Sequence, residues 1–323
     1  MTKRIMTPPP PPPLLRYEPS AWEQEWIEHV SEWSDPGTGG ALCDRMREAH
    51  ARVAAWDEGV ATSQKSGCGA LDSRLRDDAV FSRFVYRNTC TDEEASMAIE
   101  PLAGLTRHPR ALCFPGEDKL IDRGYLVLGR TSPKCATRVA EPAALSMAVP
   151  DQRVLLFDLG ASKYTSGGGG ASQQWFVDTL KLHGVTKLEY WGWEAHGEDP
   201  IKVWAELPGD LKPYYHWINI PAHPDPDSSD NPWNFIRSVA KPTDHVFVKL
   251  DIDNSPIEFQ FMQQLQADPE LQLLIDEMFF EHHVNVELMY RYWHTQREAQ
   301  RLSDTYAMVG GLRRKGMRFH SWP

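Results

Sequence analysis

The sequence predicts an α/β protein whose C-terminal half carries a Rossmann-like, doubly wound and mainly parallel sheet. After residue 150, short apolar runs alternate with segments of helical periodicity. The expected strands cover residues 154–159, 188–193, 215–220, 245–252 and 278–282, with helices over 171–183 and 257–266 and a closing edge strand within 311–322. Alternating strands and helices require crossover connections, so we expect helices on both faces of the sheet.

The first half predicts a different organisation. Residues 1–16 are expected as a disordered tail, because the prolines at 8–13 favour polyproline II. Residues 17–150 are expected as a helical or α+β cap, and residues 151–323 as the catalytic domain. Ser20 and Glu23 predict a capping box ahead of a tryptophan-rich helix. A second helix is expected over 41–60, and strands over 80–86 and 122–129.

The composition of the 323 residues is that of a soluble globular protein, with 41% hydrophobic and 24% charged residues. A net charge of -11 argues against nucleic-acid binding, which needs an excess of Lys and Arg. No apolar run approaches the length of about 18 residues that a membrane span needs. All five cysteines precede residue 136, and none forms a CxxC pair. We therefore expect no zinc site and reduced thiols in a cytoplasmic protein, with disulfides in a secretory lumen as the alternative.

Acidic residues mark three of the predicted strand ends, where ligands bind in open α/β sheets. Asp158 lies in FDLGAS, ahead of four glycines at 167–170. Glu194 follows the second strand, and a carboxylate there can accept both hydroxyls of a ribose. Asp251 and Asp253 are two residues apart on a predicted strand and should share a face. The GxGxxG pattern of dinucleotide-binding domains is absent, which disfavours NAD(P).

In their order and spacing these segments resemble the FkbM-type S-adenosylmethionine-dependent methyltransferases. FDLGAS is similar to the family motif FDxGAN, WEA to its acidic second-strand end, and VKLDIDNSPIE to VKIDxEGxE. The sequence departs from the family in the long loop over 162–170 and at residues 253–256. The resemblance implies a cofactor site at Asp158, Gly160, Ala161, Ser162, Glu194 and Ala195, with Asp251 near the transferred methyl group and Glu258 as a second acid.

Two further groups could carry chemistry. His282 and His283 follow the fifth predicted strand, so either could face Asp251 and Asp253 as a general base or as a ligand of a divalent metal. Structural hydrogen bonding is the alternative for both histidines. Arg107 and His108 could bind an anionic substrate or form salt bridges within their loop.

The sequence thus predicts O-methylation of a hydroxyl on a small molecule or sugar, with S-adenosylmethionine as cofactor. Asp251, Asp253 and His282 are the expected catalytic residues. Arg107, His108, Glu258 and His283 are the expected substrate-binding residues. Two alternatives stay open: a metal-dependent glycosyltransferase that uses Asp251 and Asp253, and an inactive methyltransferase fold that binds a protein partner through the proline run or the N-terminal helices.

Overall fold

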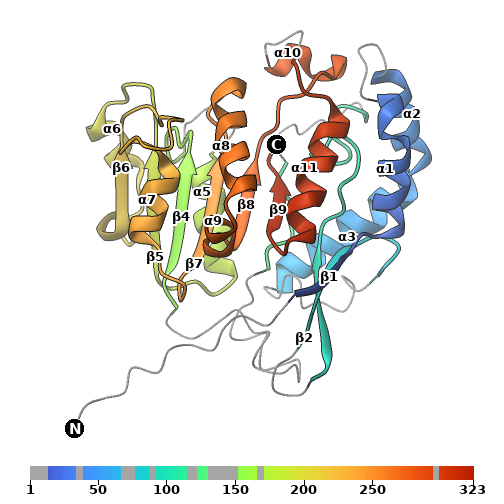
Figure 1. Ribbon diagram of the computed structural model, residues 1–323, viewed down its shortest axis with the longest axis horizontal. Coiled ribbons are helices and arrows are strands. Elements are labelled where there is room, and N and C mark those ends of the chain that lie inside the picture. The colour runs from blue at the N-terminus through green and yellow to red at the C-terminus, as the bar shows by residue number, and fades with distance from the viewer. Residues whose placement is uncertain are drawn as a thin grey trace.

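The largest element of the fold is a parallel sheet, seen here in a computed structural model (Figure 1). The structure describes residues 14–33, 39–66, 77–87, 92–114, 122–129, 152–165, 171–293 and 298–323. Within them, the sheet has the strand order β6 (Tyr215–Ile218), β5 (Leu188–Trp193), β4 (Val154–Leu159), β7 (His245–Leu250), β8 (Glu277–Phe280) and β9 (Arg318–Ser321). All five neighbouring pairs are parallel. The predicted α/β class is therefore confirmed.

The chain reverses direction across the sheet between β4 and β7. It leaves β4 through β5 and β6 on one side, then returns to pair β7 with β4 on the other side. Such a reversal is the point at which open α/β sheets form a ligand-binding crevice, beyond the carboxyl ends of the two strands. Residues that follow β4 and β7 are therefore the first candidates for a ligand-binding site.

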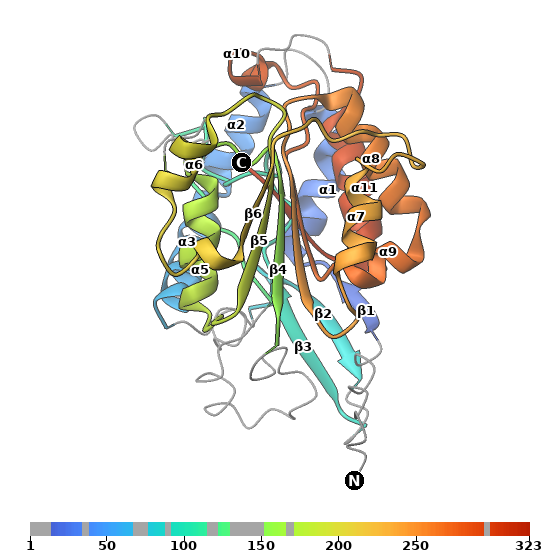
Figure 2. The same ribbon diagram turned by 90° about the vertical axis from the view of Figure 1, so that its left-hand side faces the viewer.

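Helices cover both faces of the sheet (Figure 2). One face carries α5 (Ser172–Leu182) and α6 (Pro200–Glu206), and the other carries α7 (Pro232–Val239), α8 (Ser255–Ala267), α9 (Pro269–Leu274) and α11 (Leu302–Arg314). Asp199, Asn231 and Asn254 cap α6, α7 and α8 through their side chains, each followed by an early proline. Residues 311–314 belong to α11, so only 318–321 of the predicted closing segment form a strand. Three short elements complete this half: η3 (Lys212–Tyr214), η4 (Glu287–Met289) and α10 (Tyr290–Trp293).

The N-terminal elements lie beside β9 and α11, at the opposite end of the sheet from β6 (Figure 1). They comprise α1 (Ala21–Trp33), α2 (Gly39–Glu48), α3 (His50–Ser66) and an antiparallel sheet of β1 (Leu14–Glu18), β2 (Ser82–Arg87) and β3 (Glu94–Ile99). The tryptophans of α1 join the same continuous apolar core as the strands of the parallel sheet. The two halves of the chain therefore share one core.

Several predictions for this half need correction. The helix expected over 41–60 is two helices with a turn at Ala49. Ser20 caps α1, as predicted, but Glu23 accepts from Tyr17, Ser82 and Leu102 instead of the cap residue. Residues 122–129 form no strand, because the N–H groups of Val127 and Gly129 bond to the buried carboxylates of Glu100 and Glu277 in place of a neighbouring strand.

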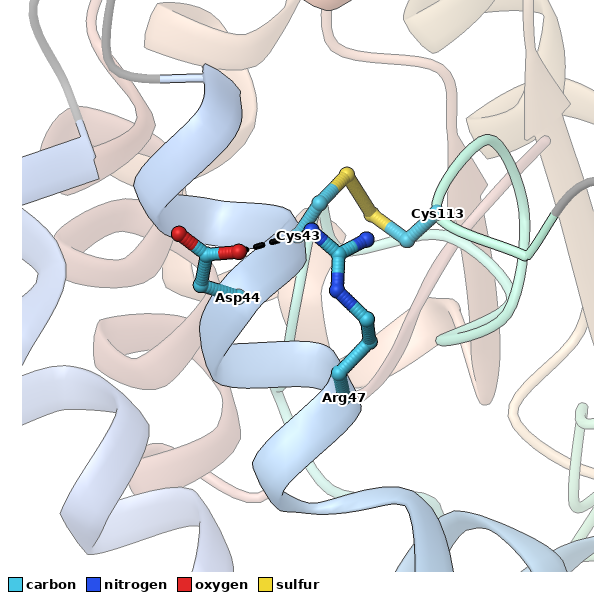
Figure 3. The surroundings of a disulfide bond; sticks show 4 residues. All are labelled: Cys43, Asp44, Arg47 and Cys113. Carbon is cyan, nitrogen blue, oxygen red and sulfur yellow. Dashed lines mark hydrogen bonds and ion pairs between the residues drawn. A yellow bond between two sulfur atoms is a disulfide. The ribbon is translucent and has the colours of Figure 1, made fainter.

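A disulfide joins Cys43 in α2 to Cys113 in the loop that follows β3 (Figure 3). Their Cα atoms lie 5.0 Å apart, within the normal range for a disulfide. Both residues are buried in the core between α2 and that loop. The expectation of reduced thiols is thus wrong for this pair, and the other three cysteines lie outside the described residues.

A fully buried set of charged side chains ties the N-terminal half to β9 and α11. We call it the buried ion network, and it consists of Glu23, Glu100, Glu277, Arg313, Arg318 and His320. His320 lies between two carboxylates: its Nδ1 is 2.7 Å from Glu100 Oε1, and its Nε2 contacts Glu277 Oε2. Each ring nitrogen therefore faces a carboxylate oxygen, an arrangement that favours the doubly protonated imidazolium form.

Candidate functional site

A buried lysine organises the reversal point of the sheet. Lys249 on β7 lies beside Asp158 on β4, and its Nζ is 3.0 Å from Asp158 Oδ1, 3.1 Å from Asp251 Oδ2 and 3.0 Å from the carbonyl oxygen of Gly160. Burial alone would lower the pKa of Lys249, but Asp158 and then Asp251 outweigh it and raise that pKa. The ammonium group therefore stays charged and holds both strand ends together.

Asp158 has no surface left for a ligand. Its side chain is fully buried, and its second oxygen accepts a hydrogen bond from the Tyr190 hydroxyl. Burial and the neighbouring Asp158 raise the pKa of Tyr190 well above its ordinary value, so the phenol remains a donor. The structure thus places Asp158 as a buried support for Lys249, and not as the exposed cofactor-binding residue that the resemblance implied.

The loop after β4 and the end of β5 are bonded to each other. The N–H groups of Gly160 and Ala161 donate to the carbonyl of Trp193 at 3.0 and 2.8 Å. Ser162 N donates to Glu194 Oε2 at 3.0 Å, while His196 N donates to Glu194 Oε1 at 2.7 Å. Glu194 is consequently fixed in a buried position beside Ser162, whereas Ala195 is exposed.

Gly160 is where the β4 loop touches the segment after β7. Its φ is +84°, and an added Cβ atom would lie 1.6 Å from the carbonyl oxygen of Asp251. Only glycine allows this backbone conformation and this approach. The glycine is therefore explained by the crossing of two chain segments, without any ligand.

Asp251 and Asp253 do not share a face as predicted, because β7 ends at Leu250. Asp253 adopts a φ of +54°, in the left-handed region, so the alternation of a strand does not reach it. Asp251 turns toward Lys249 and is 19% exposed, whereas Asp253 is 86% exposed and lies 4.0 Å from His283 Nε2. The two carboxylates therefore contact different side chains, Lys249 for Asp251 and His283 for Asp253.

The adjacent histidines point in different directions. His282 Nδ1 lies 2.9 Å from the Thr305 hydroxyl of α11, and burial lowers the pKa of His282 to about 4. His283 stacks on Trp293, and its Nε2 lies 3.4 Å from Glu281 Oε2. Of the two, the structure therefore brings His283 to the predicted acids and leaves His282 against α11.

Glu258, at the start of α8, lies under the same segment. Its Oε1 accepts from Ile252 N at 2.8 Å, and its Oε2 has no hydrogen-bond partner within the described part of the chain. Burial raises the pKa of Glu258 to about 7, and its charge interacts with His283, Asp251 and Asp253. A buried carboxyl oxygen without a partner is uncommon and indicates a functional role or a missing ligand.

The basic residues predicted to bind substrate are separated. Arg107 is buried, pairs with Glu281, and lies 5.4 Å from the centre of the Trp293 ring. His108 instead lies 3.2 Å from Asp57 of α3, outside this cluster. Sequence reasoning missed Arg123, whose guanidinium is 4.3 Å above Trp322 and interacts with Asp251. It missed Arg123 because that residue lies within 122–129, the segment wrongly predicted as a strand.

Comparisons with protein-family models, with curated proteins and with solved structures found no match to this chain. No helix among the described residues is both long and apolar enough to cross a membrane.

Proposed function

We propose that the chain is an S-adenosylmethionine-dependent O-methyltransferase of the FkbM type that acts on a hydroxyl of a small molecule or sugar. The observation that carries the proposal is the position of Glu194. It is held at the tip of β5 by a backbone N–H of the β4 loop, next to the reversal point between β4 and β7. An acid at this place in a doubly wound sheet suits a ribose diol.

The carboxylate of Glu194 can accept further hydrogen bonds, as a ribose ligand would need. An ionised carboxylate accepts about four hydrogen bonds. Backbone N–H groups of Ser162 and His196 provide two of them, and the ring of His196 lies 3.1 Å from Oε1. Acceptor capacity therefore remains for ribose hydroxyls, with the carboxylate already oriented.

Asp251 is the residue of the proposed site that would contact the hydroxyl to be methylated. When bound, S-adenosylmethionine supplies an electrophilic methyl group on a sulfonium. Asp251 is partly exposed, and its Oδ2 is held by Lys249. Its carboxylate would accept the proton of the acceptor hydroxyl, while Lys249 fixes its orientation. His282 is directed to α11, so Asp251 is the better-placed base.

The glycosyltransferase alternative has less geometric support. A shared metal would need Asp251 and Asp253 to converge, but they face Lys249 and His283 respectively. An inactive fold that binds a protein partner predicts no nucleotide binding at all. Both alternatives are outcomes of the binding experiment.

Titration calorimetry with S-adenosylhomocysteine tests the proposal. We expect stoichiometric binding without added metal, and a loss of about ten- to hundredfold in Glu194→Gln, because hydrogen bonds to a charged group contribute about 1.5–3 kcal/mol. Glu198→Gln is the matched control, since that acid pairs with Lys163 at the protein surface. A folded wild-type protein that ignores S-adenosylhomocysteine, or that binds UDP with manganese, refutes the proposal.

A further inference from the structure

We propose that Asp253, Glu281 and His283 form a binding site for a divalent transition-metal ion. The three side chains come from the segments that follow β7 and β8, and one ligand atom of each lies within 4.8 Å of the others. The site shares no residue with the proposed cofactor pocket at Glu194. The inference is therefore independent of the methyltransferase proposal.

The distances suit chelation. His283 Nε2 lies 3.4 Å from Glu281 Oε2 and 4.0 Å from Asp253 Oδ1. Ligands about 2.1 Å from a tetrahedral ion lie about 3.4 Å apart. The exposed Asp253 side chain would have to move closer to its partners, from 4.0 Å to His283 Nε2 and from within 4.8 Å of Glu281.

The neighbours of these residues orient the ligand atoms. Trp293 Nε1 donates to Glu281 Oε1 at 3.1 Å, and Arg107 pairs with that same oxygen. The other oxygen, Oε2, is the one that faces His283. Trp293 also stacks on the His283 ring at a centroid distance of 4.9 Å. Outer contacts of this kind fix the ligands of metal sites.

The chain beside this cluster has one unusual backbone conformation and one buried carboxyl oxygen without a hydrogen-bond partner among the described residues. Asp253 has a left-handed backbone, which is uncommon for a residue other than glycine and is typical of functional sites. Glu258 bonds to the N–H of Ile252, next to Asp253, and its buried Oε2 has no partner among the described residues.

The donor set selects the kind of ion. One imidazole nitrogen with carboxylate oxygens suits zinc, manganese or iron(II), whereas magnesium and calcium prefer oxygen alone. The guanidinium of Arg107 offsets part of the negative charge, which favours a moderate affinity. The competing explanation is that His283 only contacts Glu281 and Asp253 as an ion-pair partner, so that no metal binds.

Calorimetry with zinc or manganese, on the intact untagged chain and without nucleotide, decides between them. We expect one ion per chain, and at least tenfold weaker binding in Asp253→Asn and in His283→Gln. His29→Gln, at an exposed histidine of α1, should bind as the wild type does. Cobalt substitution should give visible absorption bands that His283→Gln loses.

Asp253→Asn keeps the test valid if His283→Gln misfolds, because the Asp253 side chain is 86% exposed. Wild-type protein that binds no zinc or manganese overturns the proposal. So does metal binding that is unchanged in Asp253→Asn.

Discussion

Replacing His320 by glutamine should strongly destabilise the fold. His320 is fully buried between Glu100 and Glu277, and both of its ring nitrogens face carboxylate oxygens. Glutamine would remove one positive charge from the buried ion network and leave one carboxylate without its donor. Breaking a buried ion pair from one side costs about 3–5 kcal/mol, so we expect a loss of that size near pH 6.

The loss should depend on pH in a defined direction. Burial alone would lower the pKa of His320, but Glu100 and Glu277 outweigh it and hold that pKa above its ordinary 6.5. Its stabilising contribution is complete below pH 6.5 and disappears as the pH rises through the folded pKa. Burial would raise the pKa of Glu277, but Arg318 and His320 lower it to about 2. That second contribution is present above pH 4.5 and disappears as the pH falls toward 2.

Urea unfolding of wild type and His320→Gln at pH 5.5, 7 and 9 measures this difference. The gap in unfolding free energy should be largest at pH 5.5 and smaller at pH 9. His216→Gln is the control, because His216 pairs with Glu189 at 3.3 Å in a partly exposed site, where an ion pair contributes about 0–1 kcal/mol. A gap below about 1 kcal/mol, or one that is equal at all three pH values, would refute the reasoning.

Two further substitutions probe the site and the cap. Gly160→Ala should cost about 2–5 kcal/mol and abolish S-adenosylhomocysteine binding, since its Cβ would strike the Asp251 carbonyl and its φ is positive. Thermal unfolding checks this against Gly197→Ala, whose Cβ meets nothing within 4 Å, and equal melting points would contradict it. Removing the disulfide by Cys43→Ser should cost about 2–4 kcal/mol, because it closes a loop with a sequence separation of 70 residues. The unfolded, unreduced wild type should then show at most three of its five thiols to a thiol reagent, and five would exclude the bond.

The parallel sheet could be predicted because its strands are buried on both faces. All six residues of β4 are buried, and so are all six of β7, so each appears in the sequence as a largely apolar run, broken only by Asp158 in β4 and by His245 and Lys249 in β7. The N-terminal strands β1 and β3 carry no such signal, because buried and exposed residues are mixed along each of them. Tertiary contacts also decide the structure of residues 122–129. The N–H of Val127 donates to the buried carboxylate of Glu100, whereas in a strand it would have paired with a neighbouring strand.

The sequence indicated where the residues of the candidate site lie, but not which of their side chains contact one another. Glu194 and Asp251 lie just past the carboxyl ends of β5 and β7, the two parallel strands that flank β4, as their place in the sequence indicated. The direction of Asp253, and the choice between His282 and His283, depend on a single left-handed residue and on the packing of α11. Neither leaves a pattern in one sequence.

Lys249 shows why a motif residue need not touch a ligand. It stands where the family motif VKIDxEGxE has its lysine, yet residue types alone do not tell whether such a lysine is solvated or buried. The register of β4 and β7 decides, because it sets Lys249 opposite Asp158, so that one ammonium serves two carboxylates and a loop carbonyl. Substituting methionine would remove the cation that both acids contact. Asp158, which the resemblance assigns to the cofactor, therefore contacts Lys249, and Lys249 in turn holds Asp251.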